Sequence, residues 1–149
     1  MQTGRKSTLL LSLCITSCTA QEKTDAQTDN TTMTTDSITP KYLGGINPEA
    51  ALEYMKTTPD LFLIDVRTAE WRNPVFKGAV YIPHDEIRSR YKEIPSDRPV
   101  LLHCGAGVMA PRAYKYLVDL KANIKELRYI AGTPKFSEYN RWCDNNKAK

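Results

Sequence analysis

Two short, uninterrupted apolar runs constrain the fold of this chain more than any other feature of its sequence. Residues 61–64 read Leu-Phe-Leu-Ile, and residues 100–102 read Val-Leu-Leu directly before His103. A strand that is apolar at every position buries side chains on both of its faces, which is typical of a parallel sheet covered by helices on both sides. The two runs therefore predict an α/β fold with at least two central strands.

The other elements follow from turn residues and from the spacing of apolar side chains. Two further strands are expected over residues 79–82 and 127–130. The first helix begins at Asn47 and Pro48, because asparagine accepts from free backbone N–H groups and proline is tolerated at the first helical position. Other helices are expected over residues 85–91, after the loop at 104–110, and from Thr133 and Pro134 onward. Strands that alternate with helices over this length predict one α/β domain.

Apolar side chains at helical spacing predict the buried face of each main helix. The expected buried residues are Ala51, Leu52 and Met55 in the first helix, Ala113, Tyr116, Leu117 and Leu120 after the loop, and Phe136, Tyr139 and Cys143 in the last.

The N-terminal segment is predicted to be a signal peptide, over residues 1–17. It begins with Arg5 and Lys6, and the apolar run that follows is too short to span a bilayer. Residues 15–18 read Ile-Thr-Ser-Cys, which resembles the bacterial lipobox and implies cleavage before Cys18 and attachment of lipid to its thiol. Several acyl chains at one site give durable membrane binding. The alternative is an ordinary signal peptide, with Cys18 as an incidental thiol.

Residues 18–38 are predicted to form a flexible tether between the lipidated cysteine and a domain over residues 39–149. The segment is rich in Thr, Asp, Gln and Asn and has almost no large apolar residue, so it cannot form a core. A flexible coil of this length reaches on the order of 25 Å. We therefore expect a lipid-anchored protein of the bacterial cell envelope, with its domain in the periplasm or at the surface.

The charge of the chain gives no reason to expect nucleic acid as a partner. The formal charge is +4, and Arg5 and Lys6 contribute two of these positive charges within the predicted signal peptide. The small remainder is well short of the strongly basic surface that nucleic acid requires.

Cys104 is the candidate catalytic residue. It follows a buried strand, and ligands of α/β sheets bind at the carboxyl ends of such strands. Gly105 and Gly107 let the backbone curl around the thiol, so that N–H groups and the start of the next helix favour the thiolate. The predicted substrate-binding loop comprises Gly105, Ala106, Gly107, Val108, Met109 and Ala110. The alternative is an inert, buried cysteine.

Several other kinds of site are excluded or disfavoured by spacing. A phosphatase loop needs an arginine where this chain has Ala110. A metal site needs several closely spaced Cys and His residues, but His84 and His103 are the only histidines and no such cluster exists, so neither a metal nor another cofactor is expected. Strand alternation turns His103 away from Cys104, which favours a packed or hydrogen-bonded role over that of a catalytic base. Cys143 is expected to be buried, although a disulfide with Cys104 would make a redox switch.

Several motifs together resemble those of the rhodanese-like sulfurtransferase family over about residues 38–142. They are Asp65-Val66-Arg67, Glu70-Trp71, Lys77-Gly78-Ala79 before Ile82-Pro83, Leu102-His103-Cys104, and Tyr129-Ile130-Ala131-Gly132. The resemblance implies a five-stranded parallel sheet flanked by helices, with the active-site loop between a central strand and the following helix. It also implies that Cys104 accepts a sulfane sulfur as a persulfide and passes it to a thiol or cyanide. Asp65 and Arg67 would form a hydrogen-bonded pair near the loop.

Two departures from the family pattern affect the expected chemistry. Met109 stands where loops that use thiosulfate commonly carry Arg or Lys, and Arg67 and Arg112 are the nearest candidates to replace that charge. Residues 74–76, Pro-Val-Phe, replace the usual Gly, His and aliphatic residue, which is expected to alter a loop. The function expected is sulfur transfer from thiosulfate, mercaptopyruvate or a persulfide to a thiol. The alternative is a non-catalytic rhodanese-like binding or redox module.

Overall fold

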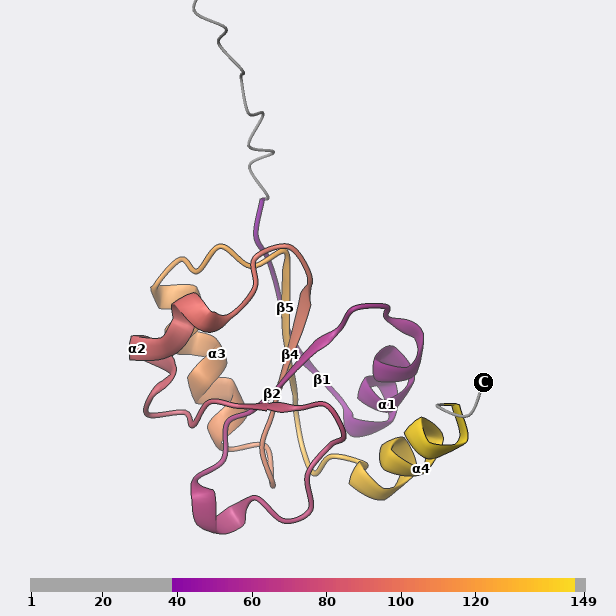
Figure 1. The fold of residues 1–149 in the computed structure, drawn as a ribbon. Coiled ribbons are helices and arrows are strands. Elements are labelled where there is room, and N and C mark those ends of the chain that lie inside the picture. The colour runs from indigo at the N-terminus through magenta and orange to yellow at the C-terminus, as the bar shows by residue number, and fades with distance from the viewer. Residues whose placement is uncertain (1–38, 147–149) are drawn as a thin grey trace, which may run out of the picture. The chain divides into compact units, whose positions relative to one another are not determined.

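Residues 39–146 are built around a five-stranded, fully parallel sheet (Figure 1). The structure, a computed structural model, describes residues 39–146, so the predicted signal peptide, Cys18 and the tether lie outside the described residues. The strand order is β1-β5-β4-β2-β3. The strands are β1 (Lys41–Ile46), β2 (Phe62–Asp65), β3 (Val80–Tyr81), β4 (Pro99–His103) and β5 (Glu126–Ile130). β4 is therefore central, and its carboxyl end lies between those of β2 and β5.

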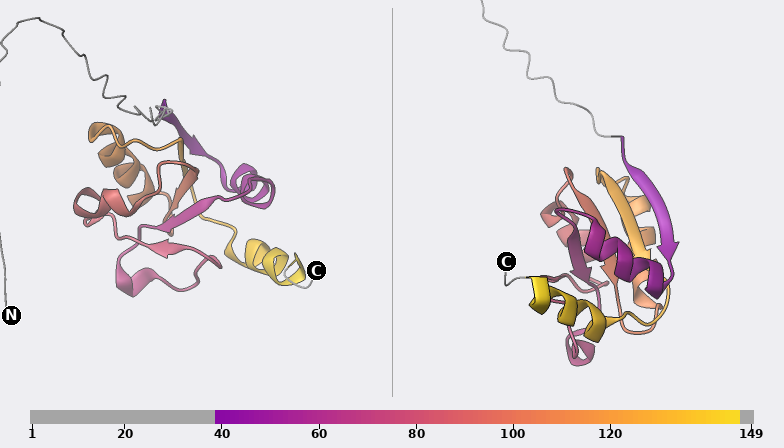
Figure 2. Two further views of the ribbon diagram at one scale, coloured as in Figure 1. Left: turned by 45° about the horizontal axis from the view of Figure 1, so that its top comes forward. Right: turned by 90° about the vertical axis from the view of Figure 1, so that its right-hand side faces the viewer.

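Helices cover both faces of the sheet, as the apolar runs predict. α1 (Pro48–Thr57) and α4 (Phe136–Asn146) lie together on one face, which is turned toward the viewer in the right-hand view of Figure 2. α2 (Ile87–Arg90) and α3 (Met109–Asp119) lie on the other face. Two short 3-10 helices, η1 (Ala69–Trp71) and η2 (Tyr91–Glu93), complete the connections.

Two apolar cores lie on the two faces of the sheet. Leu102 packs in the core beneath α2 and α3, whereas its neighbour Leu101 packs in the core beneath α1 and α4, and both are fully buried. The same alternation separates Ile64 from Leu63 in β2. Burying each such side chain stabilises the fold by about 1.5–3 kcal/mol. The predicted α/β fold with a covered parallel sheet is thus confirmed.

The first helix begins as the sequence predicts. The Asn47 side chain accepts a hydrogen bond from the Ala50 backbone N–H at 2.8 Å, and Pro48 is the first helical residue. Ala51 and Met55 are buried, and Leu52 packs at the margin of the same core. The cap and the apolar face together fix where α1 starts and which side it buries.

Three details of the predicted secondary structure were wrong. β1 was not predicted, because its burial alternates between exposed and partly buried and it contains Gly44 and Gly45. α4 begins at Phe136 and not at Thr133 and Pro134, which lie in the loop between β5 and α4. Leu120 is 36% exposed and not buried, because α3 ends one residue earlier and Leu120 is its C-cap.

Within residues 39–146, none of the helices combines the length and the apolar character that crossing a bilayer requires.

Candidate active site

Cys104 lies at the carboxyl end of the central strand, in the loop that leads from β4 to α3. Its side chain is buried, and its sulfur accepts a hydrogen bond from the Gly107 backbone N–H at 3.1 Å. The turn of the loop thus directs an N–H group at the sulfur, as the two glycines predict. A donor in this position stabilises negative charge on the sulfur more than it stabilises a neutral thiol.

Gly107 has the conformation that makes this turn possible. Its φ is +77°, and a Cβ at this position would lie 2.6 Å from the backbone nitrogen of Gly132. The loop that carries Cys104 therefore packs directly against the loop that follows β5. Gly105 is under no comparable constraint, because a Cβ there would meet only Arg67 Cδ at 3.8 Å.

A pocket of about 470 Å³ opens beside Cys104, and its wall is almost wholly apolar. This volume is within the range of about 300–1,000 Å³ that is usual for small-molecule sites. The lining residues are Arg67, Trp71, Cys104, Gly105, Ala106, Val108 and Met109.

Three residues of the predicted site do not line this pocket. Gly107 supplies its N–H to the sulfur, and Ala110 is fully buried in the core below the loop. Arg112 is exposed on α3 and is not part of the pocket wall. The structure therefore does not place Arg112 as the cation that replaces a basic loop residue.

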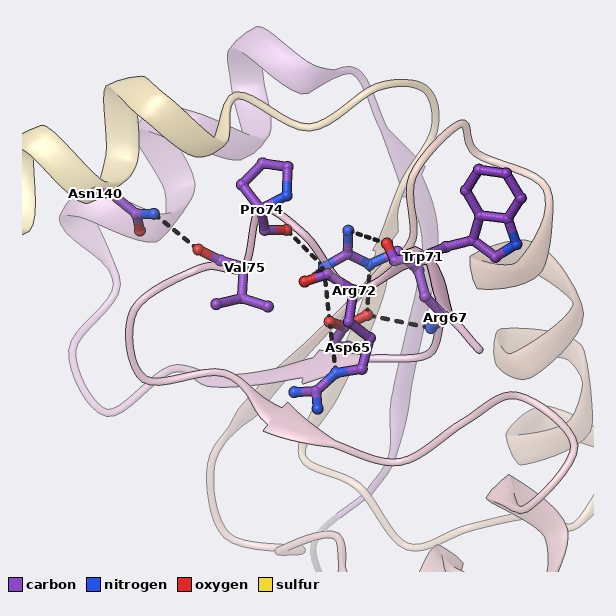
Figure 3. Close-up of polar contacts among 7 residues, drawn as sticks. All are labelled: Asp65, Arg67, Trp71, Arg72, Pro74, Val75 and Asn140. Atoms are coloured by element: carbon purple, nitrogen blue, oxygen red, sulfur yellow. Dashed lines mark hydrogen bonds and ion pairs between the residues drawn. The ribbon is translucent and has the colours of Figure 1, made fainter. Parts of the chain in front are cut away.

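Asp65 and Arg67 form a buried, two-pronged ion pair at the end of β2, and Figure 3 shows its contacts. Arg67 Nε donates to Asp65 Oδ1 at 2.9 Å and Nη2 donates to Oδ2 at 2.8 Å. The Arg67 backbone N–H also donates to Oδ1, at 3.1 Å. The pairing that the family resemblance implied is therefore present, with both side chains almost fully buried.

The same guanidinium also holds the loop after η1. Arg67 Nη1 donates to the carbonyl oxygen of Trp71 at 2.7 Å, and Nη2 donates to that of Pro74 at 2.7 Å and more weakly to that of Arg72 at 3.3 Å. From α4, Asn140 Nδ2 donates to the carbonyl oxygen of Val75 at 2.7 Å (Figure 3). These backbone contacts were not predictable from sequence, since carbonyl oxygens carry no residue signature.

Asp65 is the ionised partner of Arg67. Burial alone would raise the pKa of Asp65, but the hydrogen bonds from Arg67 and the nearby positive charge outweigh burial and hold that pKa below its ordinary value. Arg72 lies 3.5 Å from the same carboxylate and places its guanidinium 3.8 Å from the centre of the Tyr81 ring. The carboxylate thus carries its charge at neutral pH.

The structure places Trp71, the aromatic residue of the Glu70-Trp71 motif, at the pocket. Its indole lines the pocket and is 71% exposed, while its carbonyl oxygen is fixed by Arg67. Figure 3 shows the indole projecting away from the Asp65 and Arg67 pair. The sequence signals were its place in the Glu70-Trp71 motif of the family resemblance and its position shortly after the end of a predicted strand.

His103 is packed in the opposite core, as strand alternation predicts. Its ring lies edge-on to Phe76 and Phe136, with ring centres 4.8 and 5.5 Å apart. Neither ring nitrogen has a hydrogen-bond partner among the residues that the structure describes. Burial lowers the pKa of His103 to about 4, so the imidazole is neutral at neutral pH. The imidazole and the Cys104 side chain therefore lie on opposite faces of the sheet.

Cys143 is buried on the apolar side of α4, as predicted, and Cys104 and Cys143 are both free. They belong to cores on opposite faces of the sheet. A disulfide needs Cα atoms within about 7 Å and facing side chains, so the redox switch between these two cysteines is not compatible with this fold.

Phe76, from the altered 74–76 segment, fills the core beside His103.

Comparison with known proteins adds one relative and several similar structures. A protein of Allochromatium vinosum named "Sulfurtransferase" is 34% identical over 75 residues, which is 50% of this chain and 70% of that protein. A solved rhodanese homolog from the extremely thermophilic bacterium Thermus thermophilus is 23% identical and covers 60% of this chain and 96% of its own, with a TM-score of 0.47.

A structure from Staphylococcus saprophyticus has a TM-score of 0.50 at 19% identity, covers 64% of this chain and 95% of its own, and supports the fold alone. The family model described as "Rhodanese-like domain" matches residues 47–137. This match spans α1 to the first turn of α4 and includes the whole Cys104 loop. The chain therefore belongs to the rhodanese-like domain family.

Proposed function

We propose that the protein is a sulfurtransferase that carries sulfur on Cys104. The thiolate attacks the outer, sulfane sulfur of thiosulfate or a persulfide, or the thiol sulfur of mercaptopyruvate, and a new bond forms between Cys104 Sγ and that sulfur. The bond from the sulfur to the rest of the donor breaks, and its electron pair leaves with that rest. An acceptor thiolate or cyanide then attacks the outer sulfur, and Cys104 returns to the thiolate.

The observation that carries this proposal is the pairing of Cys104 Sγ with the Gly107 N–H at 3.1 Å beside an open pocket. The same N–H that faces the thiolate is placed to stabilise negative charge on the persulfide formed there. Membership of the rhodanese-like family and the sulfurtransferase relative support the same reaction class. The candidate donors for this reaction are thiosulfate, mercaptopyruvate and a persulfide, and no metal or other cofactor takes part in the steps.

Intact mass spectrometry of the full chain tests the proposal. After incubation with thiosulfate, 3-mercaptopyruvate or glutathione persulfide in turn, we expect a mass gain of one sulfur atom that a thiol acceptor removes. Cys104→Ser should abolish this gain, while the matched variant Cys143→Ser should retain it. No gain with any donor, while Cys104 remains a reduced thiol, would favour the alternative of a non-catalytic rhodanese-like binding module.

We also propose that residues 39–149 act as a domain held to a membrane of the bacterial cell envelope through lipid on Cys18. The basis is the spacing from Arg5 and Lys6 through the apolar run to Cys18. We expect the mature chain to begin at a lipidated Cys18 and to partition with membranes, and Cys18→Ser to release it. A mature chain with an unmodified Cys18 would contradict the anchor without affecting the proposed chemistry.

A further inference from the structure

The charge that surrounds the pocket does not suit a small, doubly charged anion. Among the residues that line the pocket, Arg67 is the only cationic one. Its guanidinium is committed to the Asp65 carboxylate and to the carbonyl oxygens of Trp71, Arg72 and Pro74. The positive charge of Arg67 is thus paired with a buried carboxylate before any ligand enters, and Arg72, which also contacts that carboxylate, does not line the pocket. A dianion such as thiosulfate would lose hydration there and gain no free counter-charge.

The wall of the pocket is instead suited to apolar groups. Trp71, Val108 and Met109 contribute the large side chains, and Trp71 and Val108 are 71% and 56% exposed. When a ligand covers exposed apolar side chains, apolar surface is removed from water, and this makes the free energy of binding more favourable. The volume of about 470 Å³ leaves room for an organic group beyond the reacting sulfur.

Trp71 is placed to act as a rigid wall for such a group. Its backbone carbonyl is fixed by Arg67 at 2.7 Å, and the Pro74 carbonyl of the same loop is fixed by the same guanidinium. The loop that carries the indole is therefore anchored, while the indole face remains open. An aromatic face of this kind binds aromatic and aliphatic groups with little loss of conformational freedom.

We infer that the sulfur donor is organic, with an aromatic or branched aliphatic group attached to the sulfur-bearing atom, and that inorganic thiosulfate is disfavoured. This inference rests on the proposed sulfur transfer at Cys104. For a thiosulfonate anion, R-SO₂-S⁻, the Cys104 thiolate bonds to the terminal sulfur and the sulfinate R-SO₂⁻ leaves with the electron pair. The persulfide on Cys104 and the sulfinate together carry the two negative charges of the reactants.

Three donors that react through the same kind of sulfur–sulfur bond allow the effect of donor charge on the rate to be distinguished from the effect of apolar contact. Thiosulfate is a dianion, methanethiosulfonate is a small monoanion, and benzenethiosulfonate adds a ring to the same group. The rate of persulfide formation on the full chain is measured with each donor and divided by the rate of a small free thiol with that donor. We expect benzenethiosulfonate to exceed methanethiosulfonate by at least about tenfold, and thiosulfate to be the slowest.

Variants test which residues cause the preference. Trp71→Ala should reduce the ratio of benzenethiosulfonate to methanethiosulfonate rates toward one. The matched control is Val75→Ala, which truncates another exposed apolar side chain of the same loop, outside the pocket, and should leave that ratio unchanged. Met109→Lys adds a cation to the wall and should raise the relative thiosulfate rate at least about tenfold.

The outcomes distinguish this inference from the proposed function. If no donor loads sulfur onto Cys104, the proposed sulfurtransferase function fails. If all three donors load it but thiosulfate is fastest, or the ring gives no advantage, sulfur transfer stands and the preference for an organic donor is wrong. A ring advantage that Trp71→Ala leaves intact would contradict the assigned role of the indole.

Discussion

Cys104 and Cys143 are both free and both buried, with exposed fractions of 2% and 8%, yet their surroundings differ in every other respect. Cys104 lies in an irregular loop, with the Gly107 N–H directed at its sulfur and a pocket beside it. Cys143 lies within α4, in the aromatic core that contains Phe136 and Tyr139. The comparison shows that two buried cysteines of one fold can lie in different surroundings, so burial alone does not indicate which thiol would react.

What distinguishes the two cysteines is the backbone around each of them. In α4 the N–H groups donate to carbonyl oxygens of the helix and are not available to a side chain. In the loop between β4 and α3, the turn at Gly107 leaves an N–H free to face sulfur. The reactivity that we propose for Cys104 therefore depends on the loop conformation.

The largest expected difference is in thiol alkylation. In the folded full chain, we expect iodoacetamide to modify Cys104 at least about a thousandfold faster than Cys143, because Cys143 reacts only after α4 opens locally. Peptide mass spectrometry after a time course measures both rates. In denaturant the two rates should differ by less than about threefold, and comparable rates in the folded chain would refute the comparison.

The sequence predicted the position of Cys104 because a local pattern defines it. An apolar run that ends at His103, followed by Gly105 and Gly107, identifies a strand end and a tight loop without any long-range information. Asp65 and Arg67 are equally local, and their pairing was implied by the family resemblance. These features could be predicted because the residues that interact are close in sequence.

The features that were missed depend on contacts between distant segments. Gly45 belongs to β1, where a Cβ would lie 2.7 Å from the Tyr129 ring of β5. In the sequence, Gly44 and Gly45 simply weaken the strand pattern. Trp71 lines the pocket together with Val108 and Met109, which belong to the distant loop between β4 and α3. Neither contact leaves a periodic or compositional signal.

Gly107→Ala tests the loop that distinguishes the two cysteines. We expect it to lower the free energy of unfolding by about 3 kcal/mol, since it adds a Cβ at positive φ and forces it against Gly132. Gly78→Ala isolates the conformational part, because Gly78 also has positive φ, +81°, but no atom within 4 Å of the added Cβ. That control should cost only about 1 kcal/mol.

Urea unfolding of the full chain measures both variants. Gly105→Ala is a second control, since its Cβ would make only an ordinary contact at 3.8 Å with Arg67. Equal losses for Gly107→Ala and Gly78→Ala would show that the packing of the loop against Gly132 contributes nothing, and the loop would then be held by Gly107 backbone conformation alone.

The smallest expected effect concerns His103, which adjoins Cys104 in sequence but shares the core of Cys143. Its pKa is 6.5 as a free side chain and about 4 in the fold, where burial disfavours the charged imidazolium. Between these values the unfolded chain binds more protons than the folded one, so stability falls as pH falls. From pH 7 to pH 5 this loss is about 2 kcal/mol, while carboxylates with lowered pKa values, such as Asp65, remain ionised.

The variant His103→Leu shows how much of the stability lost between pH 7 and pH 5 is caused by His103 and how much by other titrating groups. Leucine removes two buried ring nitrogens that have no partner within residues 39–146, so stability at pH 7 should be unchanged or higher. The difference in unfolding free energy between pH 7 and pH 5 should shrink by about 2 kcal/mol relative to the unaltered chain. An unaltered pH dependence would mean that His103 is already protonated or already hydrated in the fold. Water would then have access to the core that contains Cys143, although its aromatic side chains pack closely.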